Sequence, residues 1–530
     1  MFTQAYGRLI NAHGDKVNLN MNFAAIRQRI IGETHSIATP FGEKPLVYAD
    51  YTASGRSYAP IEDFIRHSVL PLYANTHSES SLTGRQTSKL REDARDIIRK
   101  ALNAGDEHAV IFCGAGSTSA INRLIDLLQL RQCAPQRTVV FIGPYEHHSN
   151  ELPWRESDVE LEVISLNADG ALDLTELEQR LRARSGKARI LASFSAASNV
   201  TGLLTDTAQV SELVHRYGGH VFWDYAAAAP YIKIDVSDKD AVFISPHKFL
   251  GGPGTPGLLV MRKELISIPI PTQPGGGTVS FVAPDFHHYL AECEQREESG
   301  TPAIVGSIRA GLVFKLQQEV GLGRIEKRER SLVRSAISRW RRHPQLKLLG
   351  NLTLPRLSIV SFQVLDGSQQ LHYAFVVALL NDLFGIQARG GCSCAGPYGH
   401  ALLEIDSETS RTLNDHVQRG NMLQRPGWVR LNFNYFIDDE TFDYLLSAVE
   451  LIADYGANLL PHYSYHSGSG TWVFRGERLP LPISLKDCAL DGTESPAQTH
   501  SSRISLSDCL KAAERRLKTP ATIHTASVSG

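Results

Sequence analysis

The chain has 530 residues, of which 42% are hydrophobic and 21% are charged, as in a globular protein with a sizeable core and two to four domains. The formal net charge of −2 provides no basic excess for nucleic acid, and no apolar run is long enough to span a bilayer. The seven cysteines are scattered and do not form a disulfide framework. We therefore expect a cytoplasmic protein without nucleic-acid or membrane partners.

Residues 1–45 are expected to form an N-terminal arm, with apolar side chains at helical spacing between residues 23 and 31. From residue 46 to residue 295, short apolar runs alternate with helical patterns. We expect strands at 46–48, 109–112, 138–142, 161–166, 189–194, 220–223 and 241–244, and helices at 60–73, 88–103, 119–130, 173–183 and 207–217. This alternation predicts a large α/β domain with a mostly parallel sheet and helices on both faces.

Residues 296–465 are expected to form a smaller α+β domain. Its predicted helices are 303–319, 324–342 and 371–384, and its predicted strands are 356–364 and 428–433. From residue 466 to residue 530 Gly, Ser, Pro and Thr become more frequent and periodicity fades. This composition predicts a flexible tail with one short amphipathic helix at 505–518.

Lys248 lies in the sequence SPHK at residues 245–248, between the buried-strand pattern 241–244 and a Gly/Pro-rich turn at 251–257. Desolvation at the end of a buried strand weakens the preference of a lysine for its charged form. A neutral amine can form a Schiff base with an aldehyde. The alternative is a strand-end lysine whose ammonium group reaches water.

A second candidate feature is the turn GAGST at residues 114–118, between a predicted strand and a predicted helix. Its amides and hydroxyls would face an anion such as phosphate at the helix N-terminus. A dinucleotide site is an alternative because Gly114 and Gly116 match part of GxGxxG, although the third glycine is missing. A plain tight turn is the other alternative.

Other polar residues follow strands of the same predicted sheet, where ligands bind in this class of fold. Asp224 is suited to keep a pyridinium nitrogen protonated, His147 to stack on such a ring, and Asn199 to reach its hydroxyl. Ser245 and His247 flank the lysine and are suited to bind a phosphate. Each residue alone also has a purely structural explanation, and their occurrence together favours a cofactor site.

Taken together, these motifs resemble the class V aminotransferase family of fold-type I pyridoxal-phosphate enzymes, most closely its cysteine desulfurase-like branch. The resemblance covers roughly residues 45–450, with matching motifs at 116–122, 146–150, 198–202, 245–248, 300–302, 389–394 and 430. It implies a mostly parallel large domain of the seven-stranded type and a smaller α+β C-terminal domain. It also implies pyridoxal 5′-phosphate as cofactor.

The resemblance implies the following site residues. The catalytic ones are Lys248, Cys394 and His147; the cofactor-binding ones are Lys248, Asp224, His147, Asn199, Ser117, Thr118, Ser245, His247 and Thr301; the substrate-binding ones are Arg430, Arg389 and His77. Thr301 would reach the phosphate of a partner subunit in a homodimer. Cys394 would take sulfur from cysteine as a persulfide and leave alanine, with a sulfur-acceptor protein as a candidate partner.

Two alternatives remain open: an aminotransferase or β-lyase acting on another amino acid, and a non-catalytic cofactor-binding scaffold. The chain also departs from the simple desulfurases, because Ala227 replaces a glutamine that contacts the ring hydroxyl, and DYTASG at residues 50–55 replaces the usual DNAAT. Molybdenum-cofactor sulfurases resemble the chain better at Ala227 and at the Cys-x-Cys sequence.

Cys392 and Cys394 are two residues apart, and in an extended segment such residues point the same way. We therefore expect both thiols to face the active site, where Arg389 would favour a thiolate. A metal half-site lacks a second pair of ligands, and we predict no metal. Simple packing in a Gly-rich loop is the remaining alternative.

Overall fold

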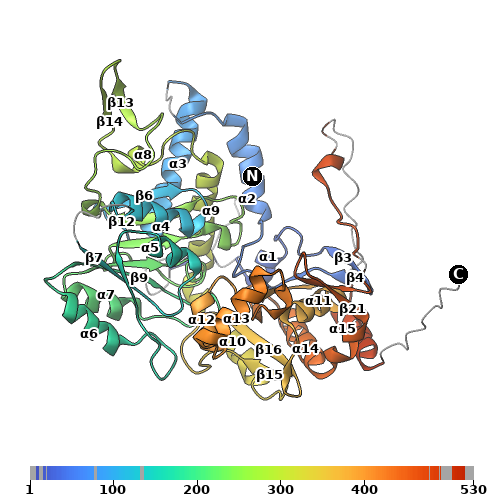
Figure 1. Cartoon of the computed structure of the whole chain (residues 1–530). Coiled ribbons are helices and arrows are strands. Elements are labelled where there is room, and N and C mark those ends of the chain that lie inside the picture. Colours follow the sequence, from blue (N-terminus) through green and yellow to red (C-terminus); the bar gives the residue numbers. More distant parts are fainter. Residues whose placement is uncertain are drawn as a thin grey trace.

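The computed structural model describes residues 8–10, 16–18, 21–76, 80–131, 137–476, 478–488, 490 and 504–519 (Figure 1). The predicted class is confirmed: a large α/β domain carries a central sheet, and a smaller α+β domain follows it. None of the helices in this described part is long and apolar enough to cross a membrane. The domain limits that we expect from the sequence stay a prediction.

The central sheet has seven strands in the order β6-β12-β11-β10-β9-β7-β8. Their bounds are β6 His108–Cys113, β7 Thr138–Ile142, β8 Glu160–Val163, β9 Arg189–Ser195, β10 His220–Asp224, β11 Ala241–Ile244 and β12 Gly257–Arg262. The strands run parallel except β12, which is antiparallel to both of its neighbours. Most of their residues are buried on both faces, as expected of a sheet covered by helices.

Helices cover both faces of this sheet. The face with Val110 and Phe112 packs in one core with α3 (Leu82–Ala101), α6 (Leu174–Arg184), α7 (Thr207–Arg216) and α9 (Ile304–Val320). The face with Ala109 and Ile111 packs with α4 (Gly116–Leu127) and α5 (Leu152–Arg155). Successive side chains along each strand point to opposite faces and therefore pack into two separate cores.

The smaller domain is built on an antiparallel sheet in the order β15-β16-β20-β19, with β17 also pairing with β16. The strands are β15 Leu346–Leu348, β16 Ile359–Asp366, β17 Gln369–Gln370, β19 Arg389–Gly391 and β20 Trp428–Asn432. Its core includes residues of α10 (Leu322–Trp340), α11 (Tyr373–Phe384) and α14 (Asp439–Tyr455). Two helices that we did not predict, α12 (Gly396–Leu402) and α13 (Ser407–Gln418), lie between β19 and β20 in sequence.

The N-terminal region connects to both domains. Strands β1 (Arg8–Ile10) and β2 (Lys16–Asn18) pair with each other, as do β3 (Ser36–Thr39) and β4 (Gly42–Pro45), and α1 covers Phe23–Arg27. Strand β5 (Val47–Tyr48) pairs with β18 (Ile386–Gln387) of the smaller domain. The helix expected at 60–73 is α2 (Ala59–Phe64), which continues as a π-helical turn at Ile65–Val69 and a 3₁₀ turn at Leu70–Leu72.

The helix expected near the C-terminus is present as α15 (Leu506–Lys518). Its buried side chains Cys509, Ala513 and Leu517 belong to the core of the smaller domain. A hairpin of β21 (Tyr463–His466) and β22 (Thr471–Phe474) precedes it. These parts of the predicted flexible tail are therefore folded, because α15 has an apolar face that the smaller domain covers.

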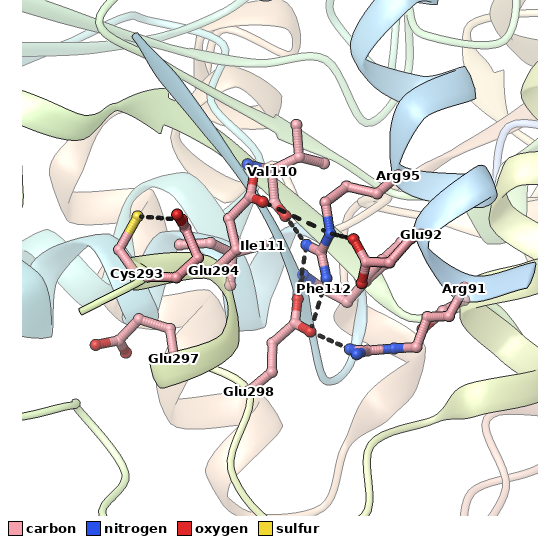
Figure 2. A network of polar contacts seen from close by, with 12 residues as sticks. Arg91, Glu92, Arg95, Val110, Ile111, Phe112, Cys293, Glu294, Glu297 and Glu298 are labelled. Carbon is pink, nitrogen blue, oxygen red and sulfur yellow. Dashed lines mark hydrogen bonds and ion pairs between the residues drawn. The ribbon is translucent and has the colours of Figure 1, made fainter. Parts of the chain in front are cut away.

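An edge of the central sheet is closed by charged side chains (Figure 2). The backbone N–H groups of Val110 and Phe112 in β6 donate to Glu294 and Glu298, at 2.6 and 2.7 Å. Arg95 bonds Glu298 at 3.1 Å, and Arg91 also pairs with this buried carboxylate. The two carboxylates accept the backbone N–H groups that a neighbouring strand would otherwise bind. Arginine side chains pair with their negative charges inside the protein.

Glu294 lies in α8 (Cys293–Arg296), and Glu298 lies two residues after the end of this helix. The network therefore anchors the chain just before residues 300–302, the segment that we expect to reach a partner subunit. Before α8, a hairpin of β13 (Val279–Val282) and β14 (His287–Tyr289) projects from the large domain (Figure 1).

Candidate active site

Carboxyl ends of the parallel strands meet at a cavity of about 220 Å³, which residues of the smaller domain close from the other side. Most of the residues expected at the site line this single cavity. They are Ser117, Thr118, His147, Asn199, Asp224, Ser245, His247, Lys248, Arg389, Cys394 and Arg430. Segments that lie more than 300 residues apart in the sequence thus meet in one place.

The N-terminus of α4 forms an anion-binding corner of the cavity. The Ser117 N–H group donates to Ser245 Oγ at 2.9 Å, and the Thr118 and Ser149 hydroxyls bond each other at 2.7 Å. Gly116 has φ +56°, and a Cβ there would lie 3.0 Å from Ser245 Oγ. A helix N-terminus with hydroxyls around it and no side chain at its first residue suits a phosphate.

Lys248 and Asp224 are two titratable residues of opposite charge that line the cavity. Lys248 ends a short 3₁₀ turn that follows β11, and burial lowers the pKa of its amine to about 8. Asp224 ends β10 and is 5% exposed, and burial raises the pKa of its carboxyl group. The Ala226 N–H group donates to Asp224 Oδ1 at 2.9 Å.

His147 carries no charge at neutral pH, because burial and the nearby Lys248 lower its pKa to about 3. The Ser149 N–H group donates to His147 Nδ1 at 3.1 Å. The ring hydrogen of the neutral imidazole therefore sits on Nε2. An uncharged, partly buried ring of this kind is suited to cover the face of another aromatic ring.

Two guanidinium groups meet at one carboxylate that we did not predict as a site residue. Asp50 bonds Arg430 Nη2 at 2.8 Å through Oδ1 and Arg389 Nε at 3.0 Å through Oδ2. Arg430 also donates to the Asn199 carbonyl at 3.0 Å. In the sequence, the only local indication that Asp50 belongs to the site is its place shortly after β5. The fold shows that both arginines converge on it.

Cys394 lies in a loop whose backbone is held by two residues near the cavity. Asn199 Nδ2 donates to the Ser393 carbonyl at 2.7 Å, and the His148 N–H group donates to the Cys394 carbonyl at 2.8 Å. Cys394 is exposed and lines the cavity. Its thiol thus stands in the same space as the Lys248 amine.

The expectation that both thiols face the site is wrong. Ser393 and Cys394 have φ values of +53° and +55°, so the segment is not extended and side chains two apart do not point the same way. Cys392 does not line the cavity; it packs against the core, and its Sγ accepts a hydrogen bond from Arg425 at 3.3 Å.

The prediction for Thr301 concerns the site of a partner subunit, so the cavity of a single chain does not test it. Thr301 is exposed, and its hydroxyl accepts a hydrogen bond from Asn75 Nδ2 at 3.1 Å. His77 lies outside the described residues. Ala227 lines the cavity at the position where the resemblance expects a glutamine. Among the side chains that the structure describes, no group of three His, Cys, Asp or Glu could hold a metal ion.

The fold is that of the class V aminotransferase family of enzymes. Residues 47–413 match the family model for aminotransferase class-V, and the chain belongs to this family. A probable cysteine desulfurase of Halalkalibacterium halodurans is 30% identical over 359 residues, which cover 67% of this chain and 85% of that protein.

Solved structures agree with this assignment. A cysteine desulfurase of Thermococcus onnurineus superposes with a TM-score of 0.65 and 26% identity, over 77% of this chain and 95% of that one. A cysteine desulfurase of Escherichia coli, at 23% identity and a TM-score of 0.64, shares the fold over 81% of this chain and 98% of that one.

Proposed function

We propose that the protein binds pyridoxal 5′-phosphate in this cavity and removes sulfur from cysteine, leaving alanine. The observation that carries the proposal is the exposed thiol of Cys394 on the same cavity as the half-buried side chain of Lys248. The similarity to proteins named cysteine desulfurases supports this activity over the aminotransferase, β-lyase and scaffold alternatives.

The residues present fit the cofactor. Lys248 would hold its aldehyde carbon, Asp224 would face its ring nitrogen and His147 would lie on its ring. Ser117, Thr118, Ser245 and His247 would receive its phosphate. Asn199 Oδ1 is buried without a hydrogen-bond donor among the described residues, so a ring hydroxyl would satisfy it.

When bound, this cofactor supplies an electron sink for charge at the substrate carbon. Asp224 would keep the ring nitrogen protonated, because a buried carboxylate is stabilised by a positive partner. Lys248 Nζ would move protons to and from the substrate carbon. The Cys394 thiolate would attack the substrate sulfur: a sulfur–sulfur bond would form, the carbon–sulfur bond would break, and a proton taken up at the carbon would yield alanine.

The two guanidinium groups would bind the carboxylate of the substrate. Asp50 holds Arg389 and Arg430 in fixed positions through one N–H group each, which leaves other N–H groups of both side chains available. Arginine pairs readily with carboxylates in a two-pronged geometry. The substrate class that this arrangement favours is an α-amino acid.

The proposed activity is tested with the holoenzyme, cysteine and a reductant. We expect sulfide and alanine in equal amounts, because each sulfur that leaves a cysteine leaves one alanine. Both products are quantified over time, together with pyruvate and ammonia. Pyruvate and ammonia in place of alanine would assign a β-lyase, a keto acid would assign an aminotransferase, and no change in the cofactor spectrum with any amino acid would assign a scaffold.

The expected homodimer is also part of this proposal. Thr301 is exposed, and the nearby segment around Asn75 is flanked by exposed apolar side chains at Phe64, Leu70, Leu72, Tyr73 and Leu82. Exposed apolar side chains that gather in one region mark a protein interface. We propose that the Thr301 hydroxyl, at the edge of this interface, reaches the phosphate site of the second subunit.

We expect the holoenzyme to sediment as a dimer and Thr301→Ala to weaken cofactor affinity about tenfold or more, the usual loss of one hydrogen bond to a charged group. Cofactor affinity is measured by fluorescence titration of the apoprotein. Thr412→Ala, at an exposed threonine of α13, is the matched control. A monomer that retains full cofactor affinity would contradict this assembly.

We also propose a reducing, cytoplasmic location and delivery of the sulfur to an acceptor protein. The six cysteines among the described residues are all free thiols, which supports the location. The exposed Cys394 thiol supports transfer to an acceptor, since a persulfide there would face the cavity mouth.

A further inference from the structure

A second cavity, of about 470 Å³, lies on the boundary between the two domains. The large domain contributes Leu204, Tyr231 and Ile232, and the smaller domain contributes one face of α10 and the segment 352–357. None of its lining residues lines the cavity around Lys248. Its volume falls in the range of small-molecule sites, about 300–1,000 Å³.

Four arginines line this cavity: Arg330, Arg334, Arg341 and Arg356. The first three lie on α10 or at its C-terminal cap, four and seven residues apart, a spacing that places them on one side of a helix over about 16 Å. They are exposed, and within the described part of the chain none of their guanidinium groups has an ion pair or a hydrogen bond. Their N–H groups are therefore free to bind an anion.

Arg356 contributes from the opposite wall. One of its terminal nitrogens donates to the Asn351 carbonyl, while its Nε is buried without a partner among the described residues. Burial lowers the pKa of this guanidinium group to about 10. A buried donor of this kind is costly unless a ligand or water satisfies it.

The two acids of the cavity do not cancel this charge. Glu329 is 4% exposed, and burial raises the pKa of its carboxyl group well above the usual value. Its Oε1 accepts from the Tyr435 N–H group at 3.2 Å. Glu326 is the other acid, so four arginines line the cavity together with two carboxyl groups.

Apart from the hydroxyls of Ser338 and Thr353, the rest of the lining is mostly apolar. The apolar side chains are Leu204, Tyr231, Ile232, Val333, Ile337, Leu352, Leu354, Pro355 and Leu357. A bare inorganic anion would use the arginines and leave these side chains without contact. A molecule with an acidic head and an apolar or aromatic body would use both.

From this geometry we propose that the cavity between α10 and residues 352–357 binds a small organic anion, with phosphate or carboxylate on the arginines and an apolar body against the leucines. Arginine pairs with both head groups through parallel N–H donors. This site is independent of the reaction at Lys248, and its occupation does not require that reaction.

The position of the cavity also connects it to the active site. The Leu357 N–H group donates to the Gly202 carbonyl at 2.8 Å, and the Leu204 N–H group donates to the Pro355 carbonyl at 3.0 Å. These bonds join the cavity wall to the loop that carries Asn199. A ligand that contacts both walls of the cavity would stabilise the arrangement in which these two hydrogen bonds join the domains.

The test is isothermal titration calorimetry of the holoenzyme with four probes: adenosine 5′-diphosphate, decanoate, inorganic pyrophosphate and adenosine. We expect the nucleotide or the fatty acid to bind more tightly than pyrophosphate and adenosine. Arg334→Glu should weaken that binding tenfold or more, the loss typical of one charged hydrogen bond. Arg342→Glu, at an exposed arginine beside the cavity that does not line it, should change it less than twofold.

Comparing the affinities for adenosine 5′-diphosphate and decanoate distinguishes a nucleotide-like ligand from a lipid-like one. Binding of pyrophosphate as tightly as either of them would overturn the role of the apolar wall. Binding that persists in Arg334→Glu would place the ligand elsewhere, and absence of binding by all four probes at millimolar concentration would reject the site. Circular dichroism of both variants checks that they are folded. Because binding is measured directly, the result can be interpreted even if the proposed desulfurase activity is not found.

Discussion

Lys248→Ala should abolish turnover, with a loss of at least about 10³-fold, because in the proposed mechanism this amine both holds the cofactor and moves the substrate proton. The variant should also fail to retain cofactor after borohydride reduction and denaturation. Mass spectrometry of the digested protein checks this directly. The peptide that contains residue 248 should carry the added mass in the parent protein and none in the variant.

Lys315→Ala is the matched control, because Lys315 is an exposed lysine of α9 that forms an ion pair with Glu319 on its own helix. This variant should keep both the added mass and the turnover. Reduced cofactor on another lysine of Lys248→Ala, together with turnover near that of the parent, would show that the amine of Lys248 is not the attachment point.

The same amine predicts a pH dependence. Its pKa is lowered to about 8, so the neutral form that attacks an aldehyde becomes dominant above pH 8 and not only above pH 10. The rate at which apoprotein attaches the cofactor should rise with pH up to about 8 and level off above it. Stopped-flow absorbance measures this rate, and a rise that continues to pH 10 would contradict the effect of burial.

Much of the site could be predicted from the sequence because parallel strands end at the same edge of a sheet. Asp224 follows one apolar run, and Ser245 and Lys248 follow the next. Once the alternation of strands and helices is recognised, these residues must lie near one another. Strand β12 runs antiparallel to its neighbours. This does not affect the prediction, because β12 places no predicted site residue at the opposite edge of the sheet.

Other parts of the site could not be predicted, because they depend on tertiary contacts. Asp50 joins Arg389 and Arg430 across more than 330 residues, and nothing in the local sequence indicates that pairing. The anion-binding character of the α10 cavity also depends on Arg356, which comes from the segment before β16. The helix alone shows only a charged surface, which is more often solvated than functional.

The orientation of Cys392 was missed for a local reason. Left-handed backbone is uncommon at residues other than glycine, so Ser393 and Cys394 gave no sequence signal for it. The same conformation turns Cys394 toward the cavity while Cys392 stays against the core. The two thiols therefore differ in surroundings although they are two residues apart.

This difference leads to the second large effect, in Cys394→Ser. A hydroxyl is a far weaker nucleophile toward sulfur than a thiolate, so release of sulfide and alanine from cysteine should fall at least about 10²-fold. Binding of cysteine should persist, because Arg389, Arg430 and Lys248 are unchanged. The measurements are sulfide and alanine production with a reductant present, and the spectral change on adding cysteine.

Cys392→Ser is the matched control, since it removes a thiol two residues away that does not line the cavity. Its Sγ accepts a hydrogen bond from Arg425, and a serine hydroxyl can accept the same bond, so activity should stay within about threefold of the parent. If Cys392→Ser loses the activity and Cys394→Ser keeps it, the thiol of Cys392 takes the sulfur and the role assigned to Cys394 is wrong. If Cys394→Ser releases sulfide and alanine at the rate of an active parent, no persulfide on Cys394 is needed and the cysteine serves only to pack the loop.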